Sequence, residues 1–196
     1  MNSNLVSHYR EAIPLDLCDD IISYYKNNGN DVYSSGIADN DSPRIKLNTS
    51  LRVSNELILY HNKNTTKGLY DKLIDSIMPI TNKWINNHPA VNQQLGSAYY
   101  EDVHILRYEP NKGHYGYHSD DDGPTVDNRV LSIIIYLNDV SEGGETEFAY
   151  IDVSPIKPSK GDVLVFPSGW THLHKGNMPI SNSKYICVTW LKNLRQ

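Results

Sequence analysis

The chain has 196 residues, of which 39% are hydrophobic and 21% are charged. This composition is typical of a folded protein and excludes a disordered chain. The length predicts one domain, residues 1–196, that can bury a sizeable core. The formal net charge of −5 disfavours a nucleic-acid partner, because proteins that bind nucleic acid are usually basic.

The sequence contains no sign of export or membrane insertion. No apolar run approaches the roughly 20 residues that a membrane helix needs, and residues 1–8 lack the basic start and apolar stretch of a signal peptide. The two cysteines, Cys18 and Cys187, are too few for a disulfide framework. We therefore expect a cytoplasmic protein with reduced thiols and no membrane partner.

Two segments in the first half of the chain have helical spacing. Apolar residues recur at intervals of three and four over residues 15–27, and Asn28-Gly29-Asn30 is typical of a helix end. Residues 65–84 repeat the pattern, with Thr65 or Thr66 as the cap and Pro79 as a predicted kink or break. We expect these helices to belong to a supporting region over about residues 1–97.

From about residue 98, short runs rich in β-forming residues alternate with turn signals such as Glu142-Gly143-Gly144. Many short strands joined by tight turns predict an antiparallel sandwich or barrel over about residues 98–196. The fold class is therefore mainly β with flanking helices (α+β). The predicted strands cover residues 99–108, 115–118, 130–137, 145–148, 162–166 and 185–191.

Residues 31–50 are polar and rich in turn residues, and they are interpreted as an exposed loop. Loops on a rigid scaffold often grip substrates. A merely solvated connection fits the same composition equally well.

His118-Ser119-Asp120 is a candidate metal-binding pair, because residues two apart on a strand point to the same face. A third ligand is available in Trp170-Thr171-His172-Leu173-His174, where strand periodicity alone does not choose between the two histidines. Two imidazoles and one carboxylate leave coordination positions open, which suits a non-haem Fe(II) that must hold a co-substrate and O2. A zinc hydrolase could use the same ligands, but no general base is evident.

Lys184 opens the last predicted strand and shares a face with Ile186, Val188 and Trp190. A lysine on an apolar face is costly to bury unless an anion pairs with it, so a bound carboxylate is its expected partner. Tyr108 and Tyr136 are the candidate hydroxyl groups beside it. Arg107 and Arg129 are further candidate anion contacts, with ordinary surface roles as the alternative.

Together these motifs resemble the prolyl 4-hydroxylase family of the Fe(II)/2-oxoglutarate-dependent dioxygenases. The similarity covers about residues 99–192 and rests on Tyr108 to Asp120, on Gly143-Gly144-Glu145-Thr146-Glu147-Phe148, and on a closing signature. In that signature a histidine followed by x-Gly is the iron ligand, and the lysine lies ten residues further on. The resemblance therefore selects His174 over His172.

The resemblance implies a double-stranded β-helix, a jelly-roll or cupin-like core. It implies Fe(II) on His118, Asp120 and His174, with 2-oxoglutarate chelating the metal and its distal carboxylate on Lys184, Tyr108 and Tyr136. It also implies O2 and ascorbate as further reactants. The implied reaction is of the procollagen-proline 4-dioxygenase type: a prolyl residue in a peptide or protein is hydroxylated, and succinate and CO2 are released. Two alternatives remain, namely an oxygenase of this fold with a non-prolyl substrate and a non-catalytic jelly-roll binding module.

Overall fold

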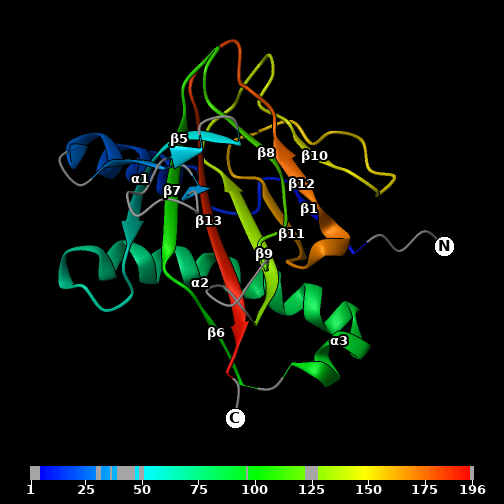
Figure 1. Ribbon diagram of the computed structural model, residues 1–196. Helices are drawn as coiled ribbons and strands as arrows, with labels where there is room; N and C mark the ends of the chain where they lie inside the picture. The colour runs from blue at the N-terminus through cyan, green and yellow to red at the C-terminus, as the bar shows by residue number, and fades with distance from the viewer. Residues whose placement is uncertain are drawn as a thin grey trace.

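The computed structural model describes residues 5–29, 32–35, 37–38, 47–48, 51–95, 97–121 and 128–194. Within these residues, three helices and a short 3-10 helix accompany the strands (Figure 1). The helices are α1 (Leu15–Asn27), α2 (Asn64–Asn87), α3 (Pro89–Gln94) and η2 (Trp170–His172). The strands are β1 (Ser7–Tyr9), β2 (Tyr33–Ser35), β3 (Ile37–Ala38), β4 (Leu47–Asn48), β5 (Arg52–Leu59), β6 (Ala98–Tyr100), β7 (Val103–Tyr108), β8 (His114–His118), β9 (Arg129–Tyr136), β10 (Thr146–Phe148), β11 (Val163–Pro167), β12 (His174–Gly176) and β13 (Lys184–Asn193).

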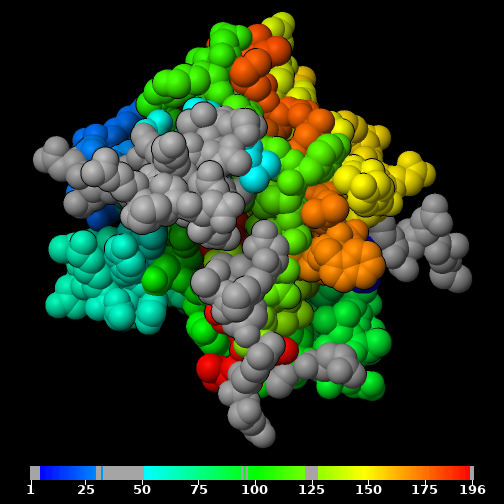
Figure 2. Space-filling model, viewed as in Figure 1, coloured from blue at the N-terminus to red at the C-terminus, as the bar shows by residue number. Residues whose placement is uncertain are grey.

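The strands form a curled antiparallel sheet in the order β1-β11-β9-β13-β7-β5-β8-β12-β10. Strand β5 joins its two parts, because its C-terminal half pairs with β7 and its N-terminal end pairs with β8. Figure 2 shows the face on which β8 (green) and the orange segment that contains β12 lie side by side. This arrangement is the predicted jelly roll, so the predicted fold class is confirmed.

The two faces of the larger part of the sheet bury different cores. The outer face packs on the helices: Ile21 of α1 and Leu73, Ile77 and Trp84 of α2 are buried against residues such as Ile133. In Figure 1, α2 crosses behind β7, β13 and β9. The inner face carries a second cluster, composed of Leu106, Tyr108, Ile134, Tyr136, Phe148, Ile156, Leu164, Phe166, Ile186, Val188 and Trp190. The helices therefore support the sheet from outside and leave its inner face to the site.

Helix α1 spans the predicted residues 15–27, and Asn28 follows it as the C-cap. Helix α2 is longer than predicted and continues through Pro79 without a break. Pro79 lies on the exposed side of α2, where the hydrogen bond that it removes faces solvent. Thr66 does not cap α2 in the expected way. Its hydroxyl instead donates to the carbonyls of Tyr60 and Lys63.

Strand β5 is the main element that the sequence prediction missed. The region expected to be helical support therefore contributes a strand of eight residues to the sheet. Leu57 and Leu59 of β5 join the outer core, whereas the alternate residues Arg52 and Glu56 line an internal cavity. A strand with charged residues on its inner face lacks the usual β pattern. The strand predicted at 99–108 is likewise divided into β6 and β7.

The loop predicted at residues 31–50 lies largely outside the described residues, which include only Val32 and the backbones of β2, β3 and β4 there. Cys18 and Cys187 are free thiols, both buried in the outer core. Among the helices that the structure describes, none is both long enough and apolar enough to cross a membrane.

Candidate metal centre

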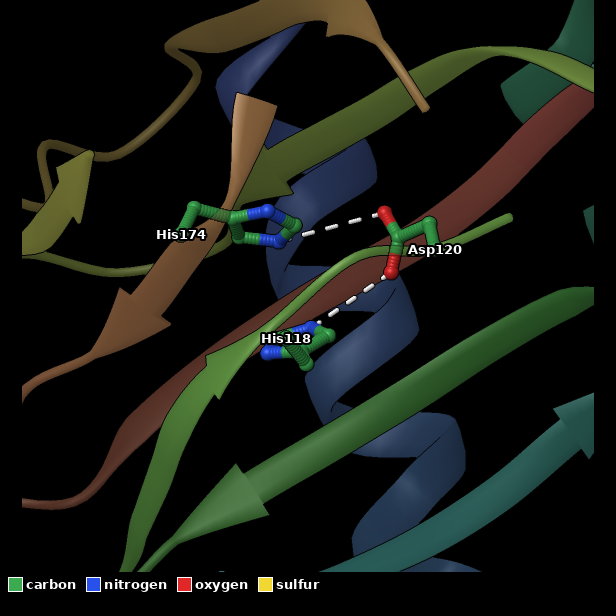
Figure 3. A group of neighbouring side chains, drawn as sticks. All are labelled: His118, Asp120 and His174. Carbon is green, nitrogen blue, oxygen red and sulfur yellow. Dashed lines mark ion pairs between the residues drawn. The ribbon is translucent and has the colours of Figure 1, made fainter. Parts of the chain in front are cut away.

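Three predicted ligands converge where β8 ends beside β12. His118 is the last residue of β8 and lies opposite His174, the first residue of β12, in an antiparallel pair. Asp120 follows two residues later, and its carboxylate oxygens face both rings (Figure 3). The distances are 3.4 Å from Oδ1 to His118 Nε2 and 3.8 Å from Oδ2 to His174 Nε2. One ligand atom from each residue lies within 4.8 Å of the others, so the three can share one ion.

Backbone carbonyls orient both imidazole rings. Nδ1 of His118 lies 2.9 Å from the carbonyl oxygen of Gly116, and Nδ1 of His174 lies 3.1 Å from that of His172. A carbonyl only accepts, so in each neutral ring Nδ1 carries the proton and Nε2 the lone pair. Both lone pairs therefore face the carboxylate of Asp120, as metal-binding histidines require.

Asp120 is held by a buried hydroxyl that the sequence did not indicate. Ser132 of β9 donates from Oγ to Asp120 Oδ2 at 2.6 Å, and Ser168 Oγ lies 2.9 Å from Ser132 Oγ. The backbone N–H of Asp120 donates to the carbonyl of Ser168 at 3.0 Å. Partners of this kind fix the direction of a metal-binding carboxylate.

The charges at the centre suit a cation. Burial alone would raise the pKa of Asp120, but His174, His118 and the Ser132 hydroxyl outweigh it and hold this pKa well below its usual range. Burial lowers the pKa of His174 to about 4, despite the opposing effect of Asp120. A carboxylate beside a neutral imidazole is the protonation state that binds a divalent metal.

The three ligands open onto a cavity of about 400 Å³ between the two parts of the sheet. Its floor and walls come from β5, β7, β8, β9, β10, β12 and β13. The lining residues are Arg52, Glu56, His104, Leu106, Tyr108, Tyr115, His118, Ser119, Asp120, Arg129, Ile134, Thr146, His174, Lys175, Gly176, Lys184, Ile186, Val188 and Trp190. As predicted, Lys184, Ile186, Val188 and Trp190 share the inner face of β13.

Lys184 is a buried cation without a carboxylate partner among the residues described. The residue is 2% exposed, and its Nζ donates to the carbonyl oxygen of Gly144 at 2.6 Å. Burial lowers the pKa of Lys184 to about 7, and Glu145 offsets only part of that effect. A carbonyl dipole compensates poorly for a buried ammonium group. The site therefore fits an anion that would complete the pair.

The turn that supplies this carbonyl depends on glycine. Gly143 has φ +70°, and a Cβ at this residue would lie 2.3 Å from the carbonyl oxygen of Met178. Gly144 also has a positive φ, of +77°. A side chain at residue 143 would displace the turn and move the acceptor away from Lys184.

Tyr108 lines the cavity directly opposite Lys184 in the β7–β13 pairing, and its ring centroid lies 5.6 Å from Lys184 Nζ. Burial raises the pKa of Tyr108 to about 12, although Arg52 beside it acts in the other direction. Tyr136 is also 5.6 Å from Lys184 Nζ but lies behind the cavity wall. Its hydroxyl donates to Oγ1 of Thr146 at 2.7 Å. Thr146, which lines the cavity, was not among the predicted residues.

The remaining candidate metal and anion contacts lie away from the ligand cluster or already have partners. His172 does not join the cluster of possible ligands, and its backbone carbonyl instead orients His174. Arg107 points away from the cavity and pairs with Glu109 at 3.2 Å. Arg129 lines the cavity, but Glu101 binds it through two contacts of 2.9 and 2.7 Å. Neither arginine is thus placed as the main partner of a bound anion.

Comparisons with known proteins agree with this geometry. Residues 103–192 match the family model described as the 2OG-Fe(II) oxygenase superfamily. The chain is 30% identical over 129 residues to prolyl 4-hydroxylase 13 of Arabidopsis thaliana, covering 53% of this chain and 47% of that protein. It is 34% identical over 122 residues to the probable prolyl 4-hydroxylase 9 of the same plant, covering 49% and 42%. The chain thus spans about half the length of these relatives.

The fold has a close counterpart among solved structures. The viral collagen prolyl hydroxylase of Paramecium bursaria Chlorella virus-1, solved in complex with 2-oxoglutarate, superposes with a TM-score of 0.70. The superposition covers 98% of each chain at 21% identity, so it bears on the fold alone. The family match, the related sequences and the jelly roll agree. Residues 103–192 are thus similar to the 2OG-Fe(II) oxygenase superfamily, and the related sequences over about half of the chain are a prolyl 4-hydroxylase and a probable one.

Proposed function

We propose that this chain is an Fe(II)- and 2-oxoglutarate-dependent dioxygenase that hydroxylates a prolyl residue in a peptide or protein, with succinate and CO2 as products. One observation carries the proposal. A cluster of two imidazoles and one carboxylate shares a cavity with Lys184, a buried cation that lacks a carboxylate partner among the described residues. Such a pairing suits a co-substrate that chelates a metal at one end and presents a carboxylate at the other.

Each side chain has a defined task in this proposal. His118, Asp120 and His174 hold the metal, and Ser132 keeps the carboxylate of Asp120 in position. Lys184 binds the distal carboxylate of 2-oxoglutarate, and Tyr108 contributes its hydroxyl from the facing strand. Fe(II), when bound, supplies the oxygen chemistry that amino-acid side chains lack.

Tyr136 acts less directly than the sequence predicted. Because its hydroxyl already donates to Thr146, it orients the Thr146 hydroxyl in the cavity wall beside Lys184. Tyr136 is fully buried, and burial raises its pKa far above the usual range, so its hydroxyl stays protonated as a donor. The apolar side chains of Leu106, Ile186 and Val188 keep water from this end of the cavity.

The prolyl substrate rests on the two plant relatives, which are named as a prolyl 4-hydroxylase and a probable one. Ascorbate as a reductant belongs to the same proposal. The cytoplasmic location and the single-domain organisation expected from the sequence also stay predictions.

The test is to incubate the purified chain with Fe(II), 2-oxoglutarate, O2 and a pool of proline-containing peptides. Succinate and peptide masses are then read together by mass spectrometry. We expect iron-dependent succinate and one added oxygen on a prolyl residue. Succinate with oxygen on another residue would make the substrate non-prolyl. Binding of Fe(II) and 2-oxoglutarate without any succinate would instead indicate a binding module and reject the proposed activity.

A further inference from the structure

The wall of the cavity formed by β5 and β7 carries a charged group that the proposed metal and 2-oxoglutarate sites do not use. Glu56 and His104 both line this wall. In the pairing of β13 with β7, Lys184 faces Tyr108 and Val188 faces His104. His104 lies four residues along β7 from Tyr108, the residue that faces Lys184. At 3.3 Å per residue this separation is about 13 Å.

Glu56 fixes the chemistry of the His104 ring. Its carboxylate is buried, with the residue only 4% exposed. One oxygen contacts His104 Nδ1, and the other lies 3.3 Å from Arg52 Nη2. Because a carboxylate only accepts, Nδ1 is the protonated nitrogen of the neutral ring, and Nε2 carries the lone pair. Within the described part of the chain, Nε2 makes no hydrogen bond.

Trp190 holds the His104 ring from another side. The two rings meet edge to face, with centroids 5.2 Å apart and an interplanar angle of 77°. The guanidinium of Arg129 lies 3.5 Å over the Trp190 ring, so the indole is itself fixed. Its Nε1 is buried and has no hydrogen-bond partner among the described residues. Among the residues that the structure describes, this end of the cavity therefore contains an acceptor, His104 Nε2, and a donor, Trp190 Nε1, that both lack partners.

We propose that His104, oriented by Glu56, determines substrate specificity by accepting a hydrogen bond from a backbone N–H next to the reacting residue. The inference rests on the proposed function, since it concerns the substrate of the same cavity. Lys184 is assigned to the co-substrate, so the wall around His104 is left for the substrate. A polar group built into a cavity wall rejects a ligand that cannot pair with it.

This assignment defines a class of preferred peptides. Proline has no backbone N–H, so a prolyl neighbour cannot donate to His104. The chain should thus prefer a target flanked by a residue with a free N–H over the same target inside an uninterrupted run of prolines. Glu56 acts through His104 and is a positioning residue. Its side chain need not touch the substrate.

The test starts from a peptide that the protein hydroxylates. It compares this peptide with analogues in which each backbone N–H near the target residue is methylated in turn. Rates for all analogues are measured in the same buffer. For wild-type protein, we expect one methylation to lower kcat/KM roughly tenfold, the effect of leaving the His104 acceptor unpaired beneath the bound peptide. Equal rates for every analogue would overturn the inference.

Variants identify the side chain that accepts the hydrogen bond from this N–H. His104→Leu should lose a similar factor on the unmodified peptide and show no further loss on the sensitive analogue. His61→Leu is the matched control, because His61 pairs with Asp102 at 2.7 Å outside the cavity. If His104→Leu discriminates between the peptides as well as wild type does, the inference is wrong.

Glu56→Gln tests the positioning role. The new amide can donate to Nδ1, which would move the ring proton to Nε2 and remove the acceptor. We expect the ratio of rates for the unmodified and methylated peptides to fall towards one, a change that mere loosening of the wall would not produce. An unchanged ratio would reject this role. If wild-type protein oxidises no peptide and forms no succinate, the proposed function fails, and this inference fails with it.

Discussion

Lys184 and Glu56 are both buried charges in one cavity, but their surroundings differ. Lys184 contacts a single carbonyl oxygen and no carboxylate among the described residues. Glu56 is already paired with Arg52 and His104. An isolated buried charge costs free energy that a ligand of opposite charge can recover, whereas a paired charge is satisfied within the protein. The difference indicates that Lys184 is built to bind an anion and that Glu56 is built to hold other side chains.

The metal centre shares one feature with Glu56 and another with Lys184. Asp120 is buried and hydrogen-bonded by Ser132, as a positioning group would be. However, the Nε2 lone pairs of His118 and His174 both face it, and a carboxylate cannot donate to them. A bound cation removes this conflict. The centre thus resembles Lys184 in requiring a ligand, but one of opposite charge.

The largest effect should come from removing the carboxylate at the metal centre. We expect Asp120→Ala to lower iron-dependent succinate formation by more than the roughly 10- to 100-fold that loss of an outer hydrogen-bond partner usually costs. Iron binding and succinate are measured on the same preparations. Asp102→Asn, a change in a carboxylate outside the cavity, is the control. Substantial turnover by Asp120→Ala would contradict the ligand assignment.

Lys184→Ala should act on the co-substrate and leave the chemistry largely intact. Losing one partner of a buried charge pair typically costs 2–5 kcal/mol, so we expect KM for 2-oxoglutarate to rise roughly 100-fold. At saturating 2-oxoglutarate, kcat should fall much less. Lys160→Ala removes an exterior lysine that pairs with Asp19 at 2.7 Å and should leave KM unchanged. An unaltered KM in Lys184→Ala would remove the basis for comparing it with Glu56.

The affinity for 2-oxoglutarate should depend on pH through Lys184. The pKa of this ammonium group is about 7 in the free protein and should rise when a carboxylate binds. Binding above pH 7 therefore takes up a proton, and Kd should increase up to about tenfold per pH unit, whereas Kd below pH 7 should be flat.

Anaerobic titrations with Fe(II) present measure this effect. Pyruvate, which lacks the distal carboxylate, is the control and should not show the same slope. A Kd for 2-oxoglutarate that stays constant between about pH 7 and 9 would show that Lys184 does not bind the distal carboxylate in its charged form.

Much of the fold and site could be predicted because their signals are local. Helix α1, most strands, and the shared face of Lys184 and Trp190 follow from periodicities of 3.6 and 2. The pairing of Glu56 with His104 could not be predicted, because it depends on how β5 aligns with β7 across 48 residues. Strand β5 was itself not predicted, because the charged residues that face the cavity interrupt its β pattern. Periodicity also could not separate His172 from His174, which the 3-10 helix η2 places differently.

The smallest expected effect is on the stability of the ligand-free protein, and it has opposite signs for the two charges. Lys184→Met replaces an uncompensated ammonium with an apolar side chain of similar length. We expect the free energy of unfolding to rise by about 1–2 kcal/mol, or the Tm by roughly 2–8 °C. Glu56→Leu leaves Arg52 and His104 without their shared carboxylate, and stability should fall by a few kcal/mol.

The dependence on pH gives this contrast a second test. The pKa of Lys184 is about 7 when folded and 10.5 in its ordinary state, so the unfolded chain binds more protons between these values. The destabilisation by Lys184 is therefore complete below pH 7 and disappears as the pH rises towards 10.5. The advantage of Lys184→Met, measured by urea denaturation without 2-oxoglutarate, should shrink over the same range. A constant advantage would mean that packing, rather than the buried charge, accounts for it, and Lys184 would no longer differ from Glu56 in the way proposed.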